Sequence, residues 1–85
     1  MTLRLRPDVS TADTDYGTVL LDGVGGRYWQ LNGSASVALR VLLEGGTAEQ
    51  AAQRLTATYD VDEARAREDV ERLRARLLDA KLALR

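Results

Sequence analysis

The stretch GVGGRYWQLN, residues Gly23–Asn32, decides how the 85-residue chain is organised. Three glycines in its first four residues disfavour a helix and are typical of a turn. The residues after them place two of the four aromatic side chains of the protein next to each other. Because side chains alternate along a strand, Trp29 and Leu31 would share one face. We therefore expect a turn followed by a short strand over Arg27–Leu31.

Two segments upstream complete a small sheet. Leu3 and Leu5 alternate and precede Pro7, which is typical of an edge strand. The sequence GTVLLD at 17–22 predicts a second strand, joined to the third by the glycine-containing turn of a hairpin. Between these strands, the polar residues 9–17 show no periodicity, and we expect them to form a loop.

The remainder of the chain predicts three helices. Asn32 is suited to cap a helix that runs to Glu44, and Gly45–Gly46 would end it. Thr47 and Gln50 have the spacing of a capping box at the start of a second helix.

The third helix is predicted to begin after Asp62 and to be the longest. Its apolar side chains recur at steps of three and four residues: Ala66, Val70, Leu73, Leu77, Ala80 and Leu84. Arginines and acids surround this stripe at the spacing of i,i+4 ion pairs, such as Glu63–Arg67 and Glu68–Arg72. The expected fold is therefore α+β and resembles a winged helix–turn–helix, with a three-stranded antiparallel sheet followed by three helices (β-β-β-α-α-α) in a single domain, 1–85.

Composition weighs against several classes of function. The chain has no Cys and no His, so the usual metal ligands and the usual general base are missing, and we expect neither a metal nor a catalytic centre nor a cofactor. A net charge of −1 weighs against nucleic-acid binding, because phosphate recognition requires a basic surplus. No apolar run is long enough for a membrane span, and we expect a cytoplasmic protein without a membrane partner.

The aromatic strand supports two interpretations that are compatible. Trp29 and Leu31 can fill the core under the helices, or the edge of the strand can accept an extended peptide, since nothing but Arg27 protects it from pairing. In the second interpretation the third helix forms one wall of a groove with Val70, Leu73 and Leu77, and Arg74 stands at its rim. Two alternatives stay open, namely a winged-helix DNA-binding regulator and a dimerisation domain.

These features resemble a known family. A glycine-rich hairpin followed by RYWQLN, a helix ending in LLEGGT, a second helix through AAQRL, the residues YDVDE and a long leucine-rich helix are similar to PqqD-like domains. Such domains are the recognition elements of systems that make ribosomally synthesised, modified peptides. The length of the chain and the residues GRYWQLN resemble in particular the discrete leader-binding proteins of split lasso-peptide systems.

The resemblance implies a partner and a site. The leader peptide of a precursor would add as a strand beside the third strand, in the groove with the third helix, and the precursor would pass to a separate leader peptidase and an ATP-dependent cyclase. Carried onto this chain, the peptide-binding residues are Arg27, Tyr28, Trp29, Gln30, Leu31, Val70, Leu73, Arg74 and Leu77. Leu78 lies off the apolar stripe, which favours the helix flank of Arg67 and Arg74 as the one that faces the peptide.

Overall fold

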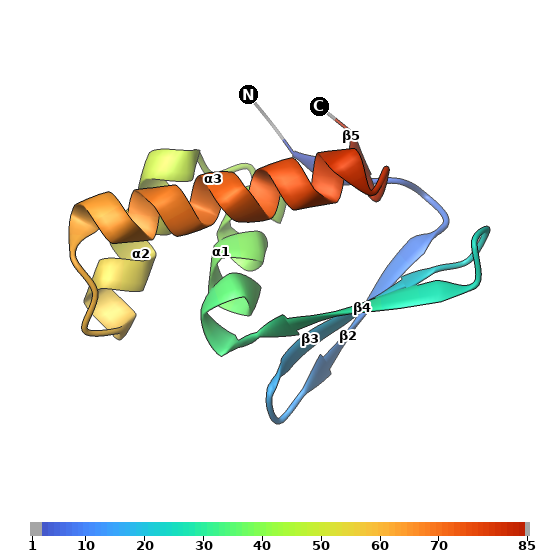
Figure 1. Ribbon diagram of the computed structural model, residues 1–85, viewed down its shortest axis with the longest axis horizontal. Helices are drawn as coiled ribbons and strands as arrows, with labels where there is room; N and C mark the ends of the chain where they lie inside the picture. The colour runs from blue at the N-terminus through green and yellow to red at the C-terminus, as the bar shows by residue number, and fades with distance from the viewer. Residues whose placement is uncertain (1–2, 85) are drawn as a thin grey trace.

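The computed structural model describes residues 3–84 as a small antiparallel sheet beside three helices, and α3 runs across both (Figure 1). The strands are β1 (Arg4–Leu5), β2 (Val9–Thr14), β3 (Gly17–Asp22), β4 (Arg27–Asn32) and β5 (Ala83–Leu84). The helices are α1 (Gly33–Leu43), α2 (Ala48–Thr58) and α3 (Glu63–Asp79). The expected α+β fold, with a three-stranded antiparallel sheet followed by three helices, is confirmed.

The main sheet has the order β2-β3-β4, so β3 is central and β4 is an edge. β3 and β4 are antiparallel, with Leu20 opposite Trp29 and Leu21 opposite Tyr28. Leu20 is fully buried and Leu31 is nearly so, whereas Tyr28 is exposed. The sheet therefore has one face against the helices and one outer face, as the alternation in the third predicted strand indicates.

The prediction of a loop over residues 9–17 is wrong. Residues Val9–Thr14 form strand β2, which pairs with β3 along its whole length. Val9 is the only buried residue of β2, and the other five residues are exposed. The strand is therefore held by its backbone ladder to β3, and its sequence lacks the alternation of apolar and polar residues that identifies a half-buried strand.

The strand predicted around Leu3 and Leu5 exists, but it lies outside the main sheet. It is β1, which pairs with β5 in a separate two-stranded ribbon that joins the two ends of the chain. The expectation that the third helix continues to Leu84 is also wrong, because α3 ends at Asp79. Lys81 then adopts a left-handed backbone conformation (φ 60°), which turns the chain into β5.

The predicted helix starts are confirmed. The side chain of Asn32 accepts a hydrogen bond from the N–H of Ala35, and Asp62 caps α3 in the same way. Thr47 and Gln50 form the capping box of α2. Asn32 is also the last residue of β4, so the edge strand passes into α1 without a loop.

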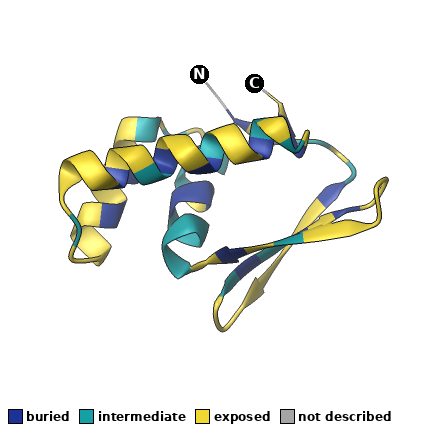
Figure 2. Cartoon of the chain, viewed as in Figure 1, coloured by how far each residue is buried: buried dark blue, intermediate teal, exposed yellow. Residues whose placement is uncertain are grey.

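The core lies between the inner face of the sheet and the three helices. Leu20, Val70 and Leu82 are its largest fully buried side chains, and they come from the sheet, from α3 and from the segment after α3. Figure 2 shows buried and exposed residues alternating along α3, so that one side of the helix packs on the core and the other is open to solvent.

Candidate functional site: the groove between strand β4 and helix α3

The outer edge of β4 carries no partner strand within residues 3–84. β4 pairs with β3 along residues Arg27–Asn32, and α3 runs above β4 in Figure 1. An unpaired edge offers a row of N–H and C=O groups to an incoming strand. The backbone of β4 is therefore available for pairing.

The register identifies which backbone groups of β4 face outward. Thr14 closes a two-residue turn by pairing with the first residue of β3, and such a pair is hydrogen-bonded. Hydrogen-bonded and open pairs alternate along antiparallel strands, so Leu20 directs its backbone groups toward β4. Trp29, opposite Leu20, directs its own N–H and C=O groups toward β3. The N–H and C=O groups of Tyr28 and Gln30 consequently point to the free edge.

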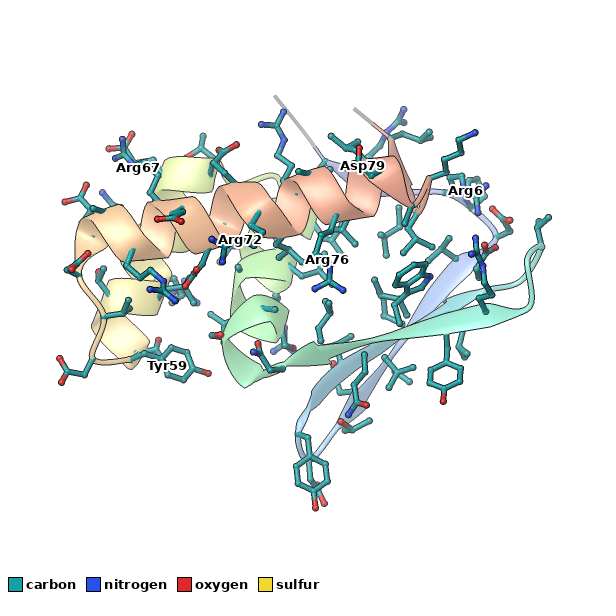
Figure 3. The ribbon with its side chains drawn as sticks, in the orientation of Figure 1. Arg6, Tyr59, Arg67, Arg72, Arg76 and Asp79 are labelled. Atoms are coloured by element: carbon teal, nitrogen blue, oxygen red, sulfur yellow. The ribbon has the colours of Figure 1, made fainter. Side chains whose placement is uncertain are left out.

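Two depressions lie along the side of α3 that faces β4 and α1. One has a volume of about 580 Å³ and is lined by Arg27 and Trp29 of β4 and by the end of α3 and the turn after it. The other, of about 280 Å³, lies between the start of α1 and the middle of α3. Arg76 lines both, and Figure 3 shows it extending from α3 toward β4. We call the two depressions together the β4–α3 groove.

The predicted strand residues have three different environments. Trp29 is half-buried and lines the groove, and the guanidinium of Arg27 lies 5.7 Å from the centre of its ring. Leu31 is buried in the core below. Tyr28 and Gln30 are exposed on strand β4, and they contribute to the free edge through their backbone.

The predicted helix residues divide between groove and core. Leu73 lines the depression of about 280 Å³ and is 6% exposed. Val70 and Leu77 are buried, at 0% and 2% exposure, and belong to the core under α3. Arg74 lies 3.8 Å from Glu71 in an ion pair and does not line either depression of the β4–α3 groove.

The groove faces a different flank of α3 from the one that the sequence favoured. Arg67 points away from the groove in Figure 3, whereas Arg72 and Arg76 lie on the side that faces α1 and β4. Sequence reasoning omitted these two arginines, together with Asp79 and Lys81, from the candidate site. Arg72, Arg76 and Asp79 follow one another at steps of four and three residues along α3, which was the available signal, but the same spacing describes any solvated helix face.

Ion pairs neutralise part of the charge on α3. The predicted pairs are confirmed, at 3.2 Å between Arg67 and Glu63 and 2.8 Å between Arg72 and Glu68. Asp69 adds contacts to Arg65 and Arg72. These acids interrupt the basic surface that a DNA recognition helix would need.

The turn before β4 is organised by Asp22. Its carboxylate accepts hydrogen bonds of 3.1 Å from the N–H groups of Val24 and Gly25, and it pairs with Arg6 at 3.1 Å. The hydrogen bond from Gly25, helped by Val24 and the charge of Arg6, lowers the pKa of Asp22 against the opposing effect of burial. These contacts fix the hairpin and hence the position at which β4 begins.

Within residues 3–84 no group of His, Cys, Asp and Glu side chains has an arrangement suited to a metal ion. No helix in the same part of the chain is both long and apolar enough to cross a membrane.

Comparison with known proteins agrees with the fold. Residues 17–83 match the family model of coenzyme PQQ synthesis protein D (PqqD). A solved structure of lasso peptide synthetase B1 complexed with the leader peptide superposes with a TM-score of 0.92 at 44% identity, and each chain is covered completely. The structure of TbiB1 in complex with the TbiA(beta) leader peptide superposes with a TM-score of 0.83 at 26% identity, covering 94% of this chain and 93% of that one. The search of curated proteins gave no match.

The family match spans most of the chain, from the start of β3 to β5. This chain therefore belongs to the PqqD family, and the expected PqqD-like recognition element is confirmed. Its similarity to lasso peptide synthetase B1 extends over all 85 residues.

Proposed function

We propose that this protein binds the leader peptide of a ribosomally made precursor by taking it up as a fourth strand of the main sheet. The peptide pairs with the outer edge of β4 and lies in the β4–α3 groove. The observation that carries the proposal is the free edge of β4 beside that groove, with the backbone groups of Tyr28 and Gln30 directed outward. The two similar structures, each solved with a leader peptide, support it.

The edge of β2 serves as an internal comparison. β2 is also unpaired on its outer side in the described part of the chain, but neither depression of the groove is lined by its residues. A depression of about 340 Å³ lies beside β2, lined by Thr11 and Asp13 of β2 and by Leu39 and Leu43 of α1. The Asp13 side chain is already paired there with Arg40 of α1 at 3.3 Å. A peptide on β4 meets the large aromatic side chain of Trp29 as well as Leu73, because both line the groove beside it. This difference favours β4.

The energetics are consistent with specific binding. Each main-chain hydrogen bond contributes about 0.5–1.5 kcal/mol net, and each well-buried apolar side chain of the peptide adds about 1.5–3 kcal/mol. After the cost of ordering the peptide, a net binding free energy of about −8 to −10 kcal/mol corresponds to a Kd between micromolar and tens of nanomolar. The backbone supplies much of the affinity, and the groove supplies the selectivity.

Binding can be tested with a defined probe. The leader peptide of the 44%-identical lasso peptide synthetase B1 is titrated into the purified protein. Trp29 is the only tryptophan and lines the groove, so its fluorescence reports occupancy directly. We expect saturable binding with a Kd of micromolar or below, and a scrambled peptide should not bind. The proposal would be refuted if neither that leader peptide nor the chain's own cognate leader peptide bound at concentrations of tens of micromolar.

The proposal also assigns the bound complex a role in lasso-peptide maturation. The chain carries no catalytic step itself and presents the precursor to a separate leader peptidase, after which an ATP-dependent cyclase acts on the core peptide; we expect this to occur in the cytoplasm. In a reconstituted reaction, addition of this protein should accelerate cleavage of the precursor by the peptidase. An excess of free leader peptide should remove the acceleration. Equal cleavage rates with and without the protein would contradict the presenting role.

A further inference from the structure

The groove is more basic than the protein that contains it. The charged residues that line its two depressions are Arg27, Arg65, Arg72, Arg76, Lys81, Asp69 and Asp79. Five of these seven are cations, although the whole chain has a net charge of −1. The groove therefore carries a local excess of positive charge at the place where the proposed peptide would lie.

Ion pairs divide these cations into two sets. Arg65 and Arg72 are paired with Asp69, at 3.3 and 3.4 Å, so their charge is largely neutralised by the helix itself. Arg27, Arg76 and Lys81 make no ion pair with any side chain of residues 3–84, and Arg27 lies over the ring of Trp29. Arg76 also stands where the two depressions meet, so any strand that runs along the groove passes it.

Lys81 is held at the groove in spite of a conformational cost. It occupies the position after the C-cap of α3 with φ of 60°, while the N–H of Leu82 bonds to the C=O of Leu77. At the corresponding position after α1, the chain has Gly45 with φ of 90°. Left-handed backbone is unfavourable for a residue with a Cβ, so a lysine here gives up stability that glycine would provide. Residues under such strain often serve a function.

Trp29 contributes a neutral donor to the same place. Its indole N–H is buried and has no hydrogen-bond acceptor among residues 3–84. A buried donor without a partner is costly, and an acceptor brought by a ligand would remove the cost.

We propose that Arg76, assisted by Lys81, selects leader peptides that carry a carboxylate side chain at the position crossing this helix. This inference rests on the proposed function and specifies what the groove recognises. The guanidinium of Arg76 binds the carboxylate through charge-assisted hydrogen bonds, which strengthen as the peptide covers the groove and displaces water. Replacement of the acidic residue by its amide should weaken binding about tenfold.

A selection experiment tests the inference. A display library that randomises each position of the leader peptide of the 44%-identical synthetase B1 is panned against the wild type, Arg76→Glu, Arg76→Gln and Arg67→Glu. Arg67→Glu is the matched control, because it makes the same charge change on a part of α3 that faces away from the groove. Circular dichroism establishes that each variant is folded.

The expected result is enrichment of Asp or Glu at one position on the wild type and on Arg67→Glu. At that position Arg76→Glu should select Lys or Arg, and Arg76→Gln should show no charge preference. Two outcomes would overturn the inference and leave the proposed function intact. In the first, the peptides that bind the wild type show no preference for an acidic residue. In the second, the acidic preference persists in Arg76→Glu. A library from which nothing is enriched on the wild type would overturn both.

Discussion

Trp29 of β4 and Arg76 of α3 line one depression of about 580 Å³ between the sheet edge and the end of the long helix. Trp29 lies on an edge strand, and the backbone N–H and C=O groups of the following residue, Gln30, point to the free edge. Arg76 lies on the helix that runs above that strand (Figure 3). Under the proposed function, the site combines a backbone template with side chains that discriminate between peptides. Strand addition to exposed sheet edges works in this way in several peptide-binding domains.

Gln30→Pro should remove leader binding without disturbing the sheet. The N–H of Gln30 points to the free edge, so proline deletes a bond to the peptide and none to β3. We expect leader affinity to fall at least tenfold, while the free energy of unfolding stays within about 1 kcal/mol of the wild type. Gln30→Ala keeps the N–H and should bind within about twofold. Equal affinity in Gln30→Pro and Gln30→Ala would mean that the edge of β4 is not used.

Val70→Ala should affect folding and leave binding unchanged. Val70 is fully buried under α3, so the substitution leaves a cavity and lowers the free energy of unfolding by about 2–3 kcal/mol. Arg67→Ala, at an exposed position, should change it by less than about 0.5 kcal/mol. Urea denaturation measures both. A large loss of leader affinity in folded Val70→Ala would show instead that the peptide reaches this side chain.

Asp22 should make the protein sensitive to acid. Its pKa is lowered in the folded state from 3.8, so its contribution to stability is present at neutral pH and is lost as the pH falls through the folded-state value. Asp22→Asn cannot titrate and lacks that contribution. The difference in urea midpoint between the wild type and Asp22→Asn should therefore be largest at pH 7 and shrink below about pH 4. A difference that stays constant between pH 7 and pH 3 would exclude this role.

Lys81→Gly should stabilise the protein and weaken its function. Glycine relieves the left-handed backbone at this position, and we expect the free energy of unfolding to rise by about 0.5–1 kcal/mol. The same change removes a cation from the groove, so affinity for an acidic leader peptide should fall severalfold. Lys81→Ala is the control, because it removes the charge and retains the strain. It should lose the same affinity without the gain in stability, and unchanged binding in both variants would remove Lys81 from the site.

Much of the fold follows from local signals in the sequence. Asn32, Thr47 and Asp62 mark helix starts because their side chains satisfy N–H groups that a helix leaves without partners, and this chemistry needs no tertiary context. The strands expected at 17–22 and 27–31 were visible from alternation and from the glycines between them, and the second of them extends one residue further, to Asn32. Strand β2 was missed because five of its six residues are exposed and four of those five are polar, so only its pairing with β3 makes it a strand.

The site was predicted in part. Trp29 and Leu73 line the groove, as the sequence and the resemblance indicated. The sequence favoured the flank of Arg67 and Arg74 because Leu78 lies off the apolar stripe, whereas Leu78 packs against the core and the groove lies along the flank of Arg72 and Arg76. The orientation of a helix depends on packing between distant segments, which periodicity alone does not specify. Peptide contact at each proposed residue stays a prediction, as does the assignment of residues 1–85 to a single domain.

Amide hydrogen exchange during leader binding tests the central claim most directly. Without peptide, the N–H groups of Tyr28 and Gln30 face an open edge and should exchange quickly, whereas that of Trp29 is protected by β3. Saturation with leader peptide should slow exchange at Tyr28 and Gln30 by at least tenfold and leave the outward positions of β2, Thr11 and Asp13, unchanged. Slowed exchange on β2 with no change at Tyr28 and Gln30, in protein saturated with peptide, would contradict strand addition at β4.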